Sequence, residues 1–128
     1  MSEAAKSSSI MSAVATLLEN YAAGKRNFSN ANLANAQLQG ENLKGVDLSY
    51  ADLTQAKLSD ANLRGADLSY ADLSLADLTG ADLRGSLLLG ANLRQAALKD
   101  AKLEGADYDR NTHFPENFDP VSAGMQQR

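Results

Sequence analysis

Hydrophobic positions recur at every fifth residue through most of this chain. Leucine occupies fifteen consecutive positions of this period, from Leu33 to Leu103, and Phe28 and Tyr108 keep the register at either end. The position two residues before each of these seventeen residues favours a small side chain, and in thirteen cases it is alanine. This regularity predicts one continuous repeat domain over residues 26–110, between an N-terminal segment (1–25) and a C-terminal segment (111–128).

A period of five excludes an α-helix for this domain. At about 100° per residue, successive leucines would drift by about 140° around a helix and would share no face. Each Ala-Asp-Leu triplet fits a strand, with alanine and leucine on one side and aspartate on the other. Strict alternation would nevertheless turn Gly65 inward and Ala66 outward. The pattern therefore predicts a solenoid that turns a corner every five residues.

A second period of twenty residues sets the number of corners in each coil. It relates Tyr50 to Tyr70, and it relates four glycines to one another: Gly45, Gly65, Gly85 and Gly105. Seven of the nine glycines stand at the last position of a pentapeptide, where a type II turn requires a positive φ. Four sides of five residues make a square coil, and parallel crossovers of this kind are right-handed. The expected all-β fold is a right-handed quadrilateral parallel β-helix, a solenoid of about four coils.

These repeats resemble the pentapeptide repeat family, whose consensus is Ala-(Asp/Asn)-Leu-X-X. The match covers 85 of 128 residues. The resemblance implies the same quadrilateral β-helix, and the Thr-X-Phe-Pro-X-X-Phe-Asp-Pro ending at 112–120 is similar to cyanobacterial members. The repeats depart from the consensus at the small inward position in Arg26, Glu41, Val46 and Ser86. They depart at the Asp/Asn position in Gln37, Lys57, Leu87, Ala97 and Lys102.

The N-terminal segment is expected to form a polar tail and then a helix that caps the first coil. An apolar stripe with helical spacing starts after Ser9 and contains Ile10, Val14, Leu17, Leu18 and Tyr21. Ser8 or Ser9 would cap its start, and Gly24 would end it. A membrane-surface helix is the rival interpretation, but the stripe lacks flanking basic residues and large aromatics.

Two charged residues, Arg26 and Glu41, stand at inward positions of the first coil. Either the end coil is wide enough for both side chains to reach solvent, or they form an ion pair that ties the helix to the solenoid. We favour the first interpretation because partly exposed ion pairs contribute little stability.

Asp or Asn fills the middle outward position in twelve of the seventeen repeats. Because both residues are accepted, the shared property is a side-chain oxygen rather than a charge. We expect this oxygen to accept a hydrogen bond from the backbone at the corner.

The C-terminal segment leaves the repeat and contains both prolines of the chain, Pro115 and Pro120. We expect a loop and tail in which Phe114 and Phe118 cover the last coil. The residues after Gly124 are expected to be disordered.

Composition argues against catalysis and against a bound cofactor. The chain has no cysteine, and His113 is its only histidine, so no metal site is expected. No phosphate-binding glycine motif occurs, and no Ser/His/Asp set can be assembled without His113, which we expect in a surface loop. A net charge of −4 argues against nucleic acid as a partner, and no apolar run could span a bilayer. We expect a cytoplasmic protein; a cleaved N-terminal signal would instead send it to the periplasm or thylakoid lumen.

The outward positions provide the only candidate site, which is a protein contact. Leu87 and Leu89 replace polar residues together in one repeat, and Tyr50 and Tyr70 line a neighbouring edge. The partner would be an unidentified protein or a second copy of this chain. Acidic residues gather on two sides of the coil, and a basic stripe of Lys44, Arg64, Arg84 and Lys102 lies on another.

The leading function is a non-catalytic protein-binding or scaffold module. The alternative is a DNA mimic that binds and protects a topoisomerase such as gyrase, as quinolone-resistance members of the family do. Against this alternative, about four coils at the strand spacing give a rod of only about 20 Å, and the basic stripe spoils the mimicry.

Overall fold

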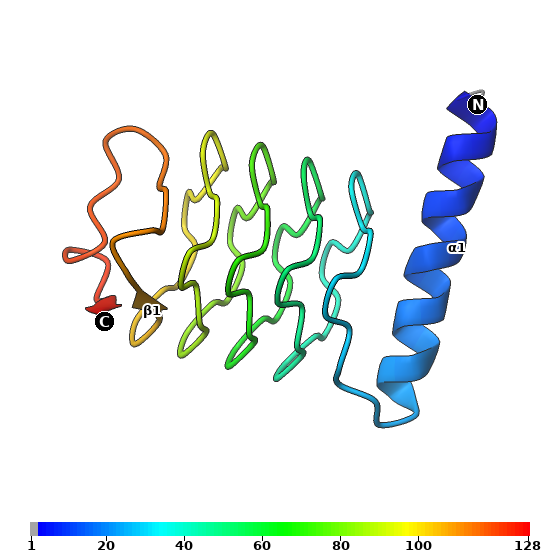
Figure 1. The fold of residues 1–128 in the computed structure, drawn as a ribbon, viewed down its shortest axis with the longest axis horizontal. Helices are drawn as coiled ribbons and strands as arrows, with labels where there is room; N and C mark the ends of the chain where they lie inside the picture. Colours follow the sequence, from blue (N-terminus) through cyan, green and yellow to red (C-terminus); the bar gives the residue numbers. More distant parts are fainter. Residues whose placement is uncertain (1–2) are drawn as a thin grey trace.

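The computed structural model describes residues 3–128. Within this range, one α-helix, α1 (Glu3–Ala22), lies across one end of a stack of coils that contains most of the remaining chain (Figure 1). Two short strands, β1 (Asp107–Tyr108) and β2 (Gln126–Gln127), pair in parallel at the other end of the stack.

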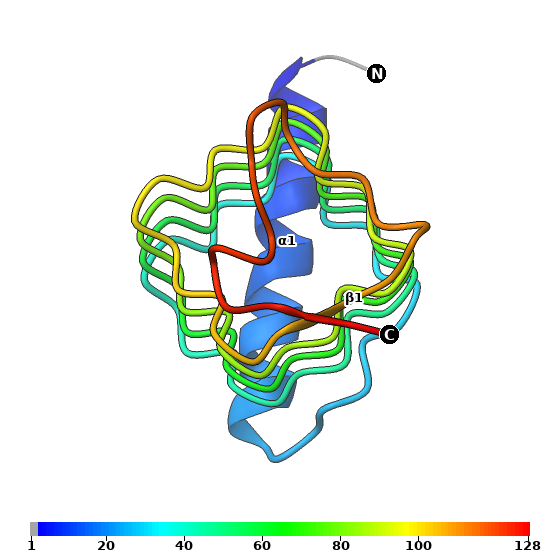
Figure 2. The ribbon, with the colours of Figure 1, turned by 90° about the vertical axis from the view of Figure 1, so that its left-hand side faces the viewer.

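The coils are joined by parallel bridges between residues that are twenty positions apart. One column of bridges runs from Asn27 through Asp47 and Asp67 to Leu87 and Asp107. Figure 2 looks along the stack and shows the coils superposed in a four-sided outline. Each side supplies one bridge rather than a long strand, because the chain turns after every triplet. Regular strand is therefore confined, in the described range, to β1 and β2.

Each corner is a tight turn whose last residue before the next side has a positive φ. The Ala51 N–H donates to the Leu48 carbonyl at 3.1 Å, and this bond recurs at successive corners. The corner glycines have φ between 66° at Gly90 and 74° at Gly105. The expectation that these glycines serve left-handed corners is confirmed.

Leucines and alanines fill the interior. Every leucine of the period from Leu33 to Leu93 is buried, as are the alanines between them from Ala36 onward. Each buried leucine contributes roughly 1.5–3 kcal/mol of transfer free energy. Leu98 is only half-buried, and Ala97 beside it ends its column of bridges.

The outward Asp and Asn side chains bind the corner backbone, as the sequence predicts. The Ser49 N–H and hydroxyl both donate to Asp47 Oδ1, at 2.9 and 2.6 Å. Asn62 makes the equivalent backbone hydrogen bond, since its Oδ1 accepts from the Arg64 N–H at 3.1 Å. The fold therefore requires a side-chain oxygen at this position and does not require a charge.

Helix α1 begins earlier than expected. It starts at Glu3, so Ser8 and Ser9 lie inside the helix and do not cap it. The prediction of a polar tail before the helix is therefore wrong for residues 3–8, and residues 1–2 lie outside the described range. Alanine, lysine and glutamate are strong helix formers, and a glutamate in the first turn suits the helix dipole.

The end of α1 agrees with the prediction. Gly24 has a φ of 95°, and its N–H donates to the Tyr21 carbonyl at 2.9 Å. The Lys25 N–H reaches back to the Asn20 carbonyl at 3.0 Å. These two bonds make a Schellman motif with glycine in the left-handed position.

Helix α1 closes the first coil through one buried side chain and two contacts at its end. Leu17 is 3% exposed. The Tyr21 hydroxyl donates to the Lys44 carbonyl at 2.6 Å, and the Arg26 guanidinium lies 3.7 Å from the centre of the Tyr21 ring. No ion pair joins Arg26 to Glu41 in residues 3–128, and Arg26 is exposed. The cation–π contact with Tyr21 ties the helix to the coil instead.

The C-terminal segment is more ordered than the sequence predicts. His113 forms a bridge with Asn92, which extends the solenoid by one side after a one-residue insertion. Met125 is buried, β2 pairs with β1, and Arg128 contacts the Asp107 carboxylate at 2.8 Å. The prediction of a disordered end after Gly124 is wrong, because the exposed edge of β1 supplies a pairing partner.

The expectation that aromatic residues cover the last coil is confirmed. Phe114 and Phe118 both pack against the core cluster. Phe114 meets the buried Tyr108 edge-on at 5.5 Å between ring centres, and Phe118 stacks on Phe114 at 5.1 Å.

Candidate protein-contact surface

Tyr50 and Tyr70 hold large side chains in a backbone conformation that disfavours them. Both have a φ of 62°. The left-handed region costs a residue with a side chain roughly 1–2 kcal/mol, and glycine and asparagine tolerate it best. Among residues 3–128, Leu75 is the only other large apolar or aromatic residue with a positive φ. The fold itself would be served better by Asn or Gly at both tyrosine positions.

The two tyrosine rings stack on one another and face solvent. Their centres are 5.1 Å apart with 14° between the ring planes. Tyr50 is 59% exposed and Tyr70 is 50% exposed. Gly90 continues the same column, and a methyl group on it would come within 2.5 Å of the Tyr70 ring. The ring pair thus rests on a glycine, which leaves it room to lie flat along the corner.

Four aspartates flank the tyrosines, two on each adjoining side of the coil. They are Asp47, Asp67, Asp52 and Asp72. The Oδ1 atom of each accepts the corner hydrogen bond described above. None of the four belongs to an ion pair within residues 3–128. We call the two tyrosines and these four aspartates the aromatic corner.

The structure brings Leu89 next to Tyr70, and it places Leu87 on the adjoining side. The Tyr70 N–H donates to the Leu89 carbonyl at 2.8 Å. Leu87 stands in the bridge column between Asp67 and Asp107. Both leucines are half-buried and thus less exposed than the two tyrosines. The tyrosines, rather than the leucines, dominate this surface.

Sequence reasoning missed one exposed residue of the same kind as the tyrosines. Leu75 is 48% exposed and has a φ of 61° at the next corner of the coil. The sequence could have indicated this exposure, because Leu75 is the one leucine that stands at the corner position of a pentapeptide.

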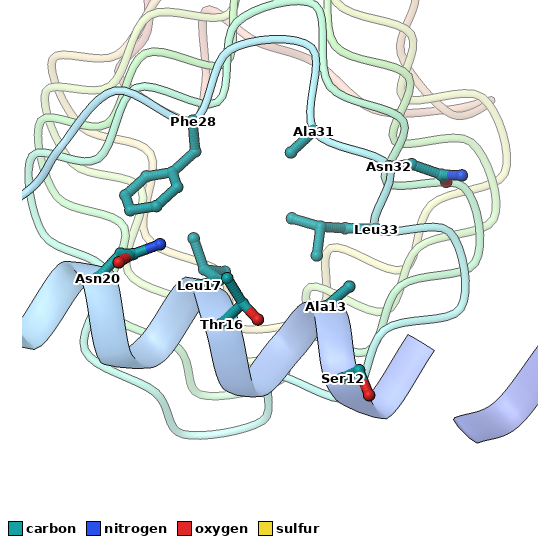
Figure 3. Close-up of a pocket in the computed structure, with 9 residues that line it drawn as sticks. All are labelled: Ser12, Ala13, Thr16, Leu17, Asn20, Phe28, Ala31, Asn32 and Leu33. Carbon is teal, nitrogen blue, oxygen red and sulfur yellow. The ribbon is translucent and has the colours of Figure 1, made fainter. Parts of the chain in front are cut away.

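The end of the solenoid beneath α1 contains an open pocket of about 320 Å³. In Figure 3, Phe28, Ala31 and Leu33 of the first coil face Leu17 and Ala13 of α1 across it. A larger groove of about 880 Å³ lies along the other flank of α1, between Ile10, Met11 and Val14 and the coil residues Gln37 and Gln55. The helix therefore covers the middle of the end coil and leaves its margins open.

The predicted basic stripe is partly neutralised. Arg84 Nε and Nη2 donate to the two carboxylate oxygens of Asp82 at 2.9 and 2.7 Å. These bonds from Arg84 lower the pKa of Asp82 to about 2. Arg84 is thus engaged within the chain, whereas Lys44 and Arg64 form no ion pair in the described range.

The described residues hold no assembled metal site. Within residues 3–128, no three His, Cys, Asp or Glu side chains come together as a metal would require. The His113 ring nitrogen Nδ1 lies 3.1 Å from Arg94 Nη2 at the surface. No helix in this range has the length and hydrophobicity needed to cross a membrane.

Comparison with known proteins identifies relatives of the whole solenoid. A family model described as pentapeptide repeats matches residues 27–65, 47–85 and 76–107. A search of curated proteins finds no match.

Solved structures include a similar protein, the pentapeptide repeat protein alr5209 from Nostoc Pcc 7120. It is 65% identical, covers 90% of this chain and 95% of its own, and has a TM-score of 0.89. Rfr23 from the cyanobacterium Cyanothece 51142 is 35% identical over 69% of this chain and 63% of its own, with a TM-score of 0.41. QnrB1, a plasmid-mediated fluoroquinolone resistance protein, shares the fold with 16% identity, a TM-score of 0.54 and coverage of 79% and 62% of the two chains.

Proposed function

This chain belongs to the pentapeptide repeat family, and from that premise we propose that it works as a non-catalytic protein-binding or scaffold module. One observation carries the proposal. Two exposed tyrosines are kept in a strained backbone conformation, at positions where Asn or Gly would stabilise the fold more. Residues that oppose folding in this way are typical of functional positions.

The centre of the proposed contact is the stacked pair Tyr50 and Tyr70, with Leu87 and Leu89 at its margin. Tyrosine suits a protein contact because it offers a large, rigid, amphipathic surface with few rotatable bonds. Leu89 adjoins Tyr70 through a backbone hydrogen bond, so that the apolar margin is continuous with the aromatic centre.

The test uses replacements that favour the fold and remove the contact. Tyr50→Asn together with Tyr70→Asn relieves the backbone strain at the two positive-φ positions. Leu87→Asp together with Leu89→Ser places polar side chains at the two outward leucine positions. Cross-linking and capture from a lysate of the source organism should lose a partner with either pair, while the melting temperature stays the same or rises. Leu75→Asn is the matched control, because it removes an equally strained apolar residue at another corner.

The partner can be a foreign protein or a second copy of this chain. Sedimentation of the wild type and of the double tyrosine variant separates the two cases, since only self-association changes the mass of the purified protein. An unchanged mass together with an unchanged set of captured proteins would remove the site.

We infer that the coils form the right-handed quadrilateral parallel β-helix expected of this family, with about four coils. Support comes from family membership and from bridges at a constant separation of twenty residues. A crystal structure with left-handed connections between the sides would contradict this inference.

Topoisomerase binding is the second candidate. It is favoured by the fold that the chain shares with QnrB1 and by the four aspartates of the aromatic corner, which form no ion pair within residues 3–128. Lys44 and Arg64 weaken it, because a DNA mimic should present negative charge throughout. The test is an assay of whether the protein protects gyrase from inhibition by a fluoroquinolone. Protection at micromolar protein would favour topoisomerase binding over the first candidate.

We propose a cytoplasmic location. Support comes from α1, whose Leu17 is buried against the first coil, so that cleavage of residues 1–25 would strip the end of the solenoid. Fractionation followed by intact-mass measurement checks this, and a mature form without residues 1–25 would contradict it.

A further inference from the structure

We propose that the aromatic corner binds a basic segment of another protein, through arginine side chains that stack on Tyr50 and Tyr70 and pair with the flanking aspartates. This inference rests on the proposed protein-binding function and specifies the chemistry of the partner.

The argument starts from a negative charge that the fold does not need. At the middle outward position the structure uses only an Oδ1 acceptor, which asparagine supplies equally well. Asn62 and Asn92 accept the same corner bond, from Arg64 and Arg94, both at 3.1 Å. The carboxylate charges at Asp47, Asp52, Asp67 and Asp72 are therefore surplus to the corner bond.

Along the same two columns, aspartates without an ion pair in residues 3–128 occur only beside the tyrosines, because Asp107 at the end of one column is held by Arg128 at 2.8 Å. The second and third coils carry aspartate at all four flanking positions. The first coil has Asn27 and Asn32 at the equivalent positions, and the fourth coil has Leu87 and Asn92. Within the described residues of these two columns, carboxylates without an ion pair thus begin and end with the tyrosine pair.

The charges are available to an outside partner. None of the four aspartates forms an ion pair within residues 3–128. In the corner bond each uses Oδ1, and the second oxygen is not engaged in it. A guanidinium group fits this surface because its flat face stacks on tyrosine while its edge donates to carboxylates. A lysine ammonium can pair with the charges but stacks less well.

A second copy of this chain is a poorer occupant than a foreign protein. Its basic stripe would have to dock on the aromatic corner, and Arg84 of that stripe is already held by Asp82. A contact between two different surfaces of identical chains also tends to produce open filaments rather than closed oligomers.

The test uses fluorescent hexa-arginine and hexa-lysine peptides as probes, with the full chain at low salt. We expect hexa-arginine to bind more tightly than hexa-lysine, and both to weaken as salt shortens the range of charge interactions. Asp67→Asn with Asp72→Asn keeps the corner bonds and should weaken hexa-arginine binding roughly fivefold. Asp60→Asn with Asp77→Asn removes the same charge elsewhere on the coil and should leave binding unchanged.

The tyrosines give a second, independent readout. Tyr50→Asn with Tyr70→Asn should weaken hexa-arginine binding by roughly fivefold to tenfold and hexa-lysine binding by less. Equal loss with both aspartate pairs would mean attraction to net charge alone and would overturn the inference, as would equal binding of both peptides or no binding of hexa-arginine.

Failure of this inference and failure of the proposed function are distinguishable. If neither peptide binds the corner but capture from a lysate still depends on the tyrosines, the corner binds a protein of different chemistry. If sedimentation alone responds to the tyrosine variant, the occupant is a second copy. If capture and sedimentation are both insensitive to the tyrosine and leucine variants, the proposed function falls together with this inference.

Discussion

The ring of Tyr70 lies against the backbone of Gly90, one coil further along the same corner. A Cβ on Gly90 would come within 2.5 Å of ring atoms Cδ1 and Cε1. Gly90 therefore has two roles, since it adopts a φ of 66° and it leaves room for the ring above it. The stacked pair depends on this absence of a side chain.

Gly90→Ala should lower the free energy of unfolding and displace the Tyr70 ring. The expected loss is roughly 1–2 kcal/mol from the left-handed backbone, plus the cost of moving the ring. Gly85→Ala is the control, because Gly85 has a φ of 69° and nothing within 4 Å of its Cβ position. Urea unfolding measures both variants, and equal losses would mean that the ring contact carries no energy.

The square interior should reject a larger side chain. Ala71 is 1% exposed and is stacked between Ala51 and Ala91, so Ala71→Leu should destabilise the chain by roughly 1–3 kcal/mol. Asp72→Asn, one residue away, keeps the corner bond and should change stability by less than about 0.5 kcal/mol. A urea series in which the two variants are equally harmful would contradict the inward and outward assignment.

Helix α1 should protect the first coil from end-to-end association. Leu17→Asp buries a charge in the contact between α1 and the first coil and should detach the helix. Detachment exposes the edge of the first coil, which has no preceding coil to pair with. Removal of residues 1–24 should have the same effect. Met11→Asp is the control, because Met11 is 69% exposed. Sedimentation should detect association in the first two proteins only, and monomers throughout would mean that α1 is no cap.

The Asp82–Arg84 pair should make a small contribution to stability that depends on pH. Arg84 lowers the pKa of Asp82 from 3.8 to about 2 in the folded chain. A carboxyl group whose pKa is lowered by folding stabilises the folded chain at pH values above its unfolded-state pKa. This stabilisation is lost as the pH falls from about 4 to about 2. The pair is partly exposed, so we expect less than about 1 kcal/mol.

Asp82→Asn isolates this contribution, because asparagine keeps the Oδ1 bond to the Arg84 N–H. The variant should be less stable than wild type at pH 7 and should match it near pH 2 in urea unfolding. A constant difference across this range would mean that the pair is not the cause.

The repeat pattern predicts the coils well because each buried position depends on its neighbours in a fixed register. Leu48 and Ala51 face inward because every triplet faces the same interior. The end of α1 at Gly24 was also predictable, because a helix C-cap depends only on local backbone geometry. The start of α1 was missed because Glu3 to Ser9 carry no apolar stripe, and helix propensity alone extends the helix there.

The candidate site was predicted only in part, because its properties depend on contacts between coils. The sequence shows that Tyr50 and Tyr70 are twenty residues apart, but not that the Tyr70 ring lies along the corner over Gly90. It suggests that Leu87 protrudes, whereas the side chain is half-buried. The order of the C-terminal residues was missed because Gln126, which pairs with Asp107, lies outside the five-residue repeat that reveals the other pairings.

Because paired positions are separated by a constant twenty residues, insertions lengthen the solenoid without disturbing its columns only when they add whole coils. Duplication of residues 51–70 would insert one whole coil and place a third tyrosine, with its own aspartates, in the existing column. An insertion of five residues would instead rotate everything beyond it by one side and carry the later columns to different faces. Such a protein can extend its aromatic corner without redesign, provided that growth occurs by complete turns.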